Sequence, residues 1–325
     1  MLNIWLRSFY GVTLPACALL LFFELAARVS RETPHLLNSL NLWPSARELL
    51  SSIVVFAIVN IPLMLAERLW PGTNSRRNYL DGAKFWLIFI VVTYCWSKIA
   101  ILLSGMLQSA PLIAWKIQSD RGAAVVALGI LLPVFVFDLF YYWFHRAQHY
   151  FAGLWRFHRV HHSIVNLNCL NSYHHTSEEI LRFPFIAIPL AFLLTVDVPQ
   201  LVLLSAFVAV WGQYIHSDTR VHLGQLHSVF VDNAYHRIHH STQGQHFNKN
   251  FAAFFSVWDK LFGTYQKPER GGLPAVGFAG VRPPRTVSDY LFMPFQQALS
   301  IDEASNPHNT ALNTDARKSG ARRLT

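Results

Sequence analysis

Four stretches of the sequence are apolar over nearly the length that a helix needs to cross a bilayer, and they constrain the fold more than any other feature. They are residues 11–29, 50–66, 85–103 and 123–144. Crossing the hydrocarbon core takes about 20 predominantly apolar residues in a helix, and a helix satisfies its own backbone hydrogen bonds there. Hydrophobic residues make up 52% of the 325 residues and charged residues only 14%, which also favours a membrane protein. We therefore expect an all-α, multi-pass membrane protein.

A fifth apolar region, residues 183–215, is interrupted by Pro184, Pro189, Asp197 and Pro199. Proline ends or kinks a helix. We therefore expect two shorter helices joined at TVDVP, which either span the membrane as a hairpin or enter it and return. The total is then four to six membrane helices. The first apolar stretch lacks a small-residue cleavage signal, so we expect it to be a retained membrane helix.

Positive charge indicates the orientation of these helices. The loop at residues 67–84 carries Arg68, Arg76, Arg77 and Lys84, and basic loops tend to remain cytoplasmic. Counting spans from this loop places the end of the fourth helix, and everything after it, on the cytoplasmic side. Three arginines around the preceding loop argue for the opposite orientation; they are Arg28, Arg31 and Arg47.

The chain is expected to have three parts. Residues 1–121 hold the amino-terminal transmembrane helices, and residues 122–267 form a histidine-rich catalytic region with a helical cytosolic cap. Residues 268–325 comprise a Gly/Pro-rich linker, a short helix at SDYLFMPFQQAL capped by Ser288, and a disordered basic tail.

Charge and cysteine content exclude two other classes of protein. The net charge is +9, but the basic residues are scattered between apolar segments without forming a basic face, so nucleic acid is not an expected partner. The three cysteines, Cys17, Cys95 and Cys169, are far apart in the sequence. We expect neither a disulfide framework nor a cysteine-based zinc site.

Histidine is concentrated in the middle of the chain, where fourteen of the 16 histidines fall between His145 and His246. Their spacing is helical: the fourth apolar helix places two of them four residues apart, and two later groups repeat an i, i+3, i+4 pattern. Such spacing gathers side chains on one face of a helix. The helically spaced residues are His145 and His149; His158, His161 and His162; and His236, His239 and His240.

Neutral imidazole binds borderline divalent metals such as iron or zinc without adding negative charge beside a membrane. Two metals with four or five nitrogen ligands each require about eight to ten histidines, which this region supplies, whereas one metal would leave most of them unused. Asp138 lies seven residues before His145, two turns earlier on the same helix face. It is a candidate to accept a hydrogen bond from a ligand histidine.

Four blocks of this region resemble the signatures of a known enzyme family. DLFYYWFHRAQH, LWRFHRVHHS, YHRIHHS and NFAAFFSVWDKLFGTY are similar to those of the fatty acid hydroxylase and sterol desaturase superfamily, over about residues 138–265. The resemblance implies an integral-membrane, non-haem di-iron oxygenase whose metal centre lies on the cytosolic face. The metal ligands that it implies are His145, His149, His158, His161, His162, His216, His236, His239 and His240.

One block departs from the family pattern. Relatives often have an Arg-x-His-Pro-x-Glu segment after the second histidine group, and ungapped counting puts Thr176 at its histidine. We take His175 as the remaining ligand, with His174 as the alternative; the acidic position then falls on Glu178 or Glu179. Three further histidines, His222, His227 and His246, match no block and are expected not to bind metal.

The resemblance implies that the protein uses O2 and externally supplied electrons to hydroxylate or desaturate a sterol, fatty-acyl or related lipid. An electron donor such as cytochrome b5 or ferredoxin is implied, because the chain has no haem or flavin motif. Four arginines beside the histidines either dock an acidic donor or anchor lipid headgroups; they are Arg146, Arg156, Arg159 and Arg237.

Two alternatives belong to other functional classes. A zinc-dependent membrane hydrolase would require a general-base glutamate in an HExxH motif, which this sequence lacks. A transporter or metal-storage protein would be expected to line a path across the membrane with its histidines, instead of clustering them beyond the helix ends.

Overall fold

The computed structural model describes residues 44–73, 78–107, 113–115, 123–196, 198–268, 273–278 and 280–296. Within these ranges the architecture is all-α, as predicted, apart from two three-residue strands. Strands β1 (Ile113–Trp115) and β2 (Leu194–Val196) pair in parallel, with Ile113 opposite Leu194. They join the loop after α3 to the loop between α7 and α8.

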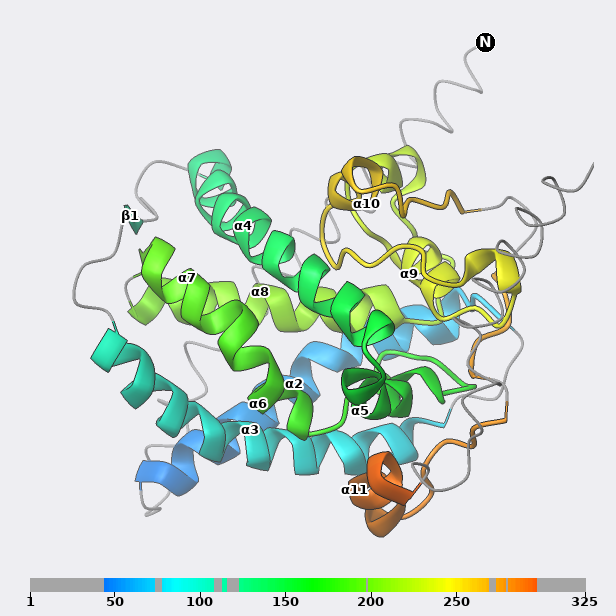
Figure 1. Ribbon diagram of the computed structural model, residues 1–325, viewed down its shortest axis with the longest axis horizontal. Helices are drawn as coiled ribbons and strands as arrows, with labels where there is room; N and C mark the ends of the chain where they lie inside the picture. Colours follow the sequence, from blue (N-terminus) through cyan, green and yellow to red (C-terminus); the bar gives the residue numbers. More distant parts are fainter. Residues whose placement is uncertain are drawn as a thin grey trace, which may run out of the picture.

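Three long apolar helices form one half of the molecule: α2 (Pro44–Leu69), α3 (Tyr79–Leu107) and α4 (Ala123–Tyr150) (Figure 1). Each contains a segment long and apolar enough to cross a membrane, namely Ser45–Leu69, Tyr79–Ile99 and Leu128–Tyr150. They correspond to the second, third and fourth predicted spans. The first predicted span, residues 11–29, lies outside the described residues, so the total of four to six spans stays a prediction.

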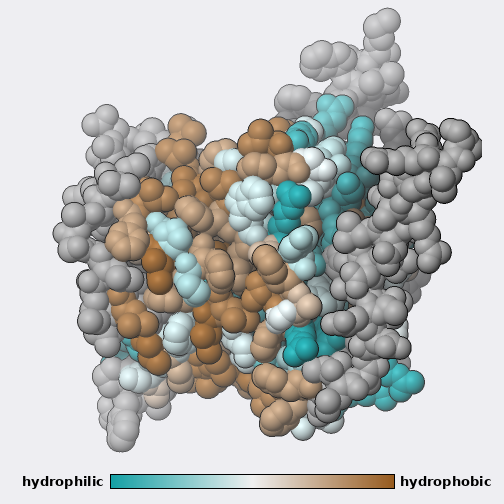
Figure 2. Space-filling model, in the orientation of Figure 1, coloured by the Kyte–Doolittle hydropathy of each residue, from teal (hydrophilic) through white to brown (hydrophobic). Residues whose placement is uncertain are grey.

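Helix α4 is the most buried of the three long helices. In its apolar segment 39% of the residues are buried, against 17% in α2 and 11% in α3. All three helices expose large apolar side chains, including Ile61, Leu87 and Leu128. Figure 2 shows this hydrophobic surface as a broad brown area. A continuous apolar surface of this kind is suited to lipid.

Residues 183–215 form two helical segments, as the sequence predicts. Helix α6 (Ser177–Arg182) continues through a π-helical turn (Phe183–Ala187) into α7 (Ile188–Leu193), and α8 (Val198–His216) follows β2. Pro189 has no amide hydrogen to donate to the carbonyl four residues earlier, which favours an irregular turn there. Helix α8 ends at His216, beside the histidines of α4 and α5.

The polar half is built from short helices: α5 (Ala152–His162), α9 (Asn233–His239), α10 (Val257–Leu261) and two 3-10 turns (Gly224–Ser228 and Gly244–His246). A buried aromatic core that includes Tyr142, Trp211, Tyr235 and Phe251 joins these elements to α4 and α8. The histidines are therefore held between the ends of the long helices and the polar half.

Helix α11 (Val287–Gln296) is the short helix predicted near SDYLFMPFQQAL, but its cap is different. The hydroxyl of Thr286 accepts the amide hydrogen of Asp289 at 3.0 Å, and the Asp289 carboxylate accepts that of Thr286 at 3.1 Å. This reciprocal pair is a capping box, so the predicted cap at Ser288 is wrong by two residues. Tyr290 packs against Phe85 with ring centroids 4.8 Å apart and fixes α11 to the fold. The predicted boundaries at residues 121 and 267 are not tested by this arrangement.

Candidate metal centre

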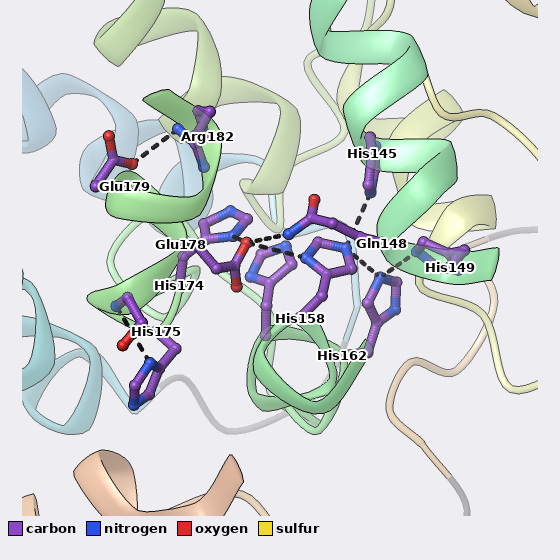
Figure 3. Close-up of polar contacts among 12 residues, drawn as sticks. His145, Gln148, His149, His158, His162, His174, His175, Glu178, Glu179 and Arg182 are labelled. Atoms are coloured by element: carbon purple, nitrogen blue, oxygen red, sulfur yellow. Dashed lines mark hydrogen bonds and ion pairs between the residues drawn. The ribbon is translucent and has the colours of Figure 1, made fainter. Parts of the chain in front are cut away.

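The turn between α4 and α5 places two histidine-bearing helix faces opposite each other. Helix α4 extends to Tyr150, beyond the predicted apolar stretch, so its last turns carry His145 and His149. The chain reverses at Phe151, and α5 then presents His158 and His162 one turn apart. All four rings are buried, and Figure 3 shows the α4 rings directed at those of α5.

Nine of the described histidines form two buried groups, and His174 forms a smaller candidate set with His158 and Glu178. In each group the candidate ligand atoms lie within 4.8 Å of one another. The first group is His145, His149, His158, His162 and His239; the second is His161, His216, His236 and His240. The groups adjoin each other, because the rings of His162 and His240 are stacked with centroids 4.5 Å apart.

Hydrogen bonds to acceptor-only oxygens fix which nitrogen of several rings carries the proton. The Nδ1 atoms of His145 and His161 lie 2.7 Å and 3.1 Å from the carbonyls of Phe251 and Tyr173. His239 makes the same contact with the carbonyl of Lys249 at 2.9 Å. A carbonyl only accepts hydrogen bonds, so Nδ1 is the donor and Nε2 keeps a free lone pair.

These lone pairs converge. The Nε2 atoms of His161 and His216 lie 3.1 Å apart. The Nδ1 of His216 donates its hydrogen to the carbonyl of Gly212 at 2.5 Å, so the Nε2 of His216 is also unprotonated. The Nε2 atoms of His145 and His158 lie 3.0 Å apart, and the Nδ1 of His158 faces the Glu178 carboxylate at 3.2 Å. Two unprotonated nitrogens cannot bond to each other at such distances. A cation between them would turn this repulsion into ligation.

Burial keeps the rings neutral. It lowers the pKa of four histidines well below the usual value, and neighbouring imidazoles lower it further; these are His161, His162, His236 and His240. Burial also lowers the pKa of His239 to about 3, although the Lys249 carbonyl opposes the shift. Neutral imidazole is the form that binds metal, so the donor set fits a pair of divalent ions.

Glu178 orients two histidines from one side. One of its carboxylate oxygens faces the Nδ1 atoms of His158 and His174 at 3.2 Å and 3.3 Å and accepts a hydrogen bond from Gln148 at 2.7 Å. Burial alone would raise the pKa of this carboxyl, but the facing His174 and His158 lower it well below its usual value. An acidic acceptor behind a ligand ring makes the ring nitrogen that faces the metal a stronger donor.

The structure differs from the sequence prediction at His175. The His174 ring stacks on His161 with centroids 3.8 Å apart, whereas Nε2 of His175 lies 3.2 Å from the carbonyl of Leu291 in α11. Figure 3 shows the two rings directed to opposite sides. Consecutive side chains of an extended segment point in opposite directions, so only one of the pair can face the histidine groups. The alternative, His174, occupies that position.

Asp138 contacts no described histidine. Its two carboxylate oxygens accept the backbone amide hydrogens of Ala253 and Phe255, at 2.9 Å and 2.8 Å. The sequence predicts that Asp138 accepts a hydrogen bond from a ligand histidine. In the structure Asp138 does not orient a ligand ring directly. It holds the segment that begins at Phe251, and the carbonyl of Phe251 accepts the Nδ1 hydrogen of His145.

Sequence reasoning missed the residues that hold the surrounding loops. Asp259 accepts hydrogen bonds from the amides of Phe251 and Ala252 and from the hydroxyls of Thr264 and Tyr235. Gly263, in the same WDKLFGTY block, has a positive φ of 75°, which glycine adopts readily.

Glu67 was also missed, because the sequence places it at the start of the basic loop, whereas in the structure it lies in the last turn of α2. This buried side chain accepts the amide hydrogens of Cys169 and Asp218 at 2.8 Å and 2.7 Å, and so joins α2 to the loop that follows His216. The sequence carries no signal that identifies these partners.

Nine of the ten residues predicted to bind metal therefore lie in the two groups, and His175 does not. Their role as ligands stays a prediction. His222, His227 and His246 lie outside both groups, in keeping with their mismatch to the sequence blocks.

A comparison of two single substitutions tests the assignment of His174. His174→Ala should lower the metal content of protein purified without chelators, because it removes a ring packed against His161. His175→Ala should retain the metal and lower the free energy of unfolding by about 1–2 kcal/mol, through loss of its bonds to Leu291 and Ser177. Elemental analysis and thermal unfolding measure the two effects. Metal loss confined to the His175 variant would reverse the assignment.

The chain is similar to a known protein family over its histidine-rich region. The sequence profile of the fatty acid hydroxylase family matches residues 130–264. An ornithine lipid hydroxylase, OlsE, from Rhizobium tropici is 30% identical over 156 residues, which cover 48% of this chain and 47% of that protein. Alkylglycerol monooxygenase from Homo sapiens is 30% identical over 129 residues, or 40% of this chain and 28% of that protein.

A third relative is the very-long-chain aldehyde decarbonylase GL1-9 from Oryza sativa subsp. indica. It is 27% identical over 176 residues, which cover 51% of this chain and 68% of that protein. The chain thus spans about half or less of the length of the first two relatives. No solved structure matches the chain.

Proposed function

The chain belongs to the fatty acid hydroxylase family through residues 130–264, and on this premise we propose that it is a membrane-bound di-iron oxygenase that hydroxylates a lipid. The observation that carries the proposal is the convergence of unprotonated Nε2 atoms in two adjoining buried groups. Nitrogen atoms placed in this way are suited to bind a cation in each group.

We assign one iron ion to each histidine group. Five neutral imidazoles face the first position and four face the second, so neither site depends on carboxylate ligands. Structural zinc is almost always four-coordinate, which fits the five-histidine group poorly. When bound, the irons supply the reduction of O2 and the oxidising power that an unactivated C–H bond requires.

The protein orients the ligand rings and keeps them neutral. Backbone carbonyls from two separate segments, one at Tyr173 and one at residues 249–251, receive the Nδ1 hydrogens of His145, His161 and His239. Each ring is thereby held in the tautomer that directs Nε2 inward. The burial of the groups also excludes bulk water from the reacting carbon.

The reaction requires an external reductant. Hydroxylation balances as R–H + O2 + 2 e− + 2 H+ → R–OH + H2O, and the sequence has no haem or flavin motif that would supply the two electrons. We propose a one-electron protein donor of the cytochrome b5 or ferredoxin type. Desaturation would use the same reductant, but the relatives named hydroxylase and monooxygenase favour hydroxylation.

We propose that the lipid reaches the centre along α4. The ring of Tyr141 lies 5.4 Å from that of His145, between centroids, on the membrane side of the histidine groups. Phe144 packs against Phe185 of the π-helical turn at 5.6 Å. An acyl or alkyl chain entering from the bilayer would therefore meet an aromatic wall before it reaches the histidines. The named relatives act on an ornithine lipid and an alkylglycerol, so we propose a membrane lipid with a long chain and a polar headgroup.

The cytoplasmic location of the centre rests on the basic loop at residues 67–84 and is part of the proposal. Against a transport role, the histidines gather in two enclosed groups near the ends of α4 and α8 and do not follow either helix across the membrane. A hydrolase would require a general base in an HExxH helix, which is absent from the sequence.

Isotope labelling tests the proposed reaction. Cells that express the protein under isotopically heavy dioxygen should accumulate one lipid class carrying one heavy oxygen atom, because the added hydroxyl derives from O2. Cells that express His161→Ala should not. Lipid mass spectrometry gives the result. A lipid that loses two hydrogens instead would indicate desaturation, and an unchanged lipid profile would contradict oxygenase activity in those cells.

A further inference from the structure

A cleft of about 1110 Å³ lies on the polar half of the molecule, next to α9. It is bounded by the loop after α8, by the first turns of α9 and by the segment after α10. Three histidines that belong to neither metal group, His222, His227 and His246, all line it. Because these three histidines line the same cleft and lie outside both metal groups, we considered a role for the cleft other than metal binding.

The lining of the cleft is basic. Arg220 and Lys267 lie on its walls and are exposed, as is His222. Asp232 is the only carboxylate among the described lining residues, and its two oxygens are engaged by the backbone amides of Leu223 and Tyr235 at 3.0 Å and 2.9 Å. With two cationic side chains against one carboxylate, the described lining has a net positive charge, which attracts an acidic partner.

Helix α9 separates the cleft from the metal centre. Asn233, Ala234 and Ile238 face the cleft, whereas His236 and His239 of the same helix belong to the two metal groups. A helix with its side chains is about 10–12 Å across. The cleft thus brings the polar surface to within roughly one helix width of both groups.

A chain of contacts connects the cleft with the second group. The buried ring of His246 lies 2.9 Å, through Nδ1, from the hydroxyl of Ser241, and Ser241 directly follows His240. Nε2 of His246 is buried and has no hydrogen-bond partner in the structure. Oδ1 of Asn233 is likewise without a partner. Unpaired buried polar atoms are uncommon in folded proteins, so the cleft contains groups suited to a polar contact.

We propose that this cleft is the docking site of a one-electron redox protein with an acidic surface. The inference rests on the proposed oxygenase function, which needs two electrons per hydroxylation. Each docked donor is oxidised by one electron, and two such events reduce the centre by the two electrons of the balanced reaction. His246 and Ser241 connect the cleft to His240 of the second group.

The arginines first considered for donor docking are less suited to that role. Arg237 is buried and donates hydrogen bonds to the carbonyl of Pro274 and to Asp218. Arg159 is also buried, and Arg146 donates to the hydroxyl of Tyr142. Arg156 remains exposed, on α5 and outside the cleft. It provides a control for a charge reversal outside the cleft.

Charge reversal tests the docking site. The double variant Arg220→Glu with Lys267→Glu should weaken binding of an acidic plant-type [2Fe–2S] ferredoxin about tenfold at low ionic strength. Binding is measured by surface plasmon resonance on metal-loaded protein in lipid nanodiscs. The wild-type affinity should fall as salt is added, and that dependence should be weaker in the double variant. Arg156→Glu should bind like the wild type.

Turnover with two reductants separates docking from lipid binding. Ferredoxin-driven hydroxylation should fall about tenfold in the double variant, while dithionite-driven hydroxylation and iron content should stay unchanged. Unaltered ferredoxin binding, or an equal loss in Arg156→Glu, would overturn the docking site. An equal loss with both reductants would assign the cleft to a lipid headgroup and would also overturn it. If iron-loaded wild-type protein bound ferredoxin through the cleft but hydroxylated no lipid with either reductant, the proposed function would fail instead.

Discussion

Replacing His161 or His239 by alanine should abolish lipid hydroxylation and lower the iron content of the protein. Each residue belongs to a different histidine group, and each ring is fixed by a carbonyl that directs its Nε2 inward. Removing one ring takes away a ligand and leaves the remaining buried lone pairs without a shared cation. We expect the iron content to fall from about two ions per chain to one or fewer.

The effect should be confined to histidines of the two groups. His308, far from them in the sequence, is the control, and His308→Ala should change neither iron content nor activity. Iron per chain is measured by elemental analysis and activity by lipid mass spectrometry. Normal turnover by the His161 variant would remove that histidine, and its group, from the catalytic centre.

Replacing Asp259 by alanine should produce the largest loss of stability outside the histidine groups. The buried carboxylate accepts four hydrogen bonds, from the amides of Phe251 and Ala252 and from the hydroxyls of Thr264 and Tyr235. Truncation leaves the buried donors of Phe251, Ala252 and Tyr235 without this acceptor, and the Thr264 hydroxyl keeps only its contact with Tyr142. We expect the free energy of unfolding to fall by about 3–5 kcal/mol.

The same substitution should loosen the metal centre, because the carbonyl of Phe251 orients His145. Asp259→Asn keeps one acceptor oxygen and should fall between the wild type and Asp259→Ala. Asp289→Ala, which removes the half-buried carboxylate of the α11 capping box, should change stability much less. Thermal unfolding followed by size-exclusion chromatography in detergent measures the differences. Equal stability of Asp259→Ala and Asp289→Ala would show that the four hydrogen bonds contribute little.

Helical spacing explains why most of the centre could be predicted from the sequence. An i, i+4 pair at His145 and His149, and i, i+3, i+4 sets in α5 and near α9, force side chains onto shared faces whatever the rest of the chain does. Apolar length likewise predicted α2, α3 and α4. Both signals are local, so one sequence was sufficient.

Contacts between distant segments could not be predicted in this way. The choice between His174 and His175 depends on how an extended loop turns, and that is set by Glu178 and by the docking of α11. Asp138 has the correct helical phase for His145 but bonds to a loop more than a hundred residues later in the chain. Periodicity gives the direction of a side chain, not the element that it meets.

Metal analysis of the wild-type protein, purified from membranes without chelators, tests the central claim most directly. Elemental analysis combined with X-ray absorption at the iron edge should find about two irons per chain, with first-shell scattering from imidazole nitrogen. A single tightly held zinc per chain, with no oxygen consumption in the presence of reductant and lipid, would contradict the proposed pair of metal sites.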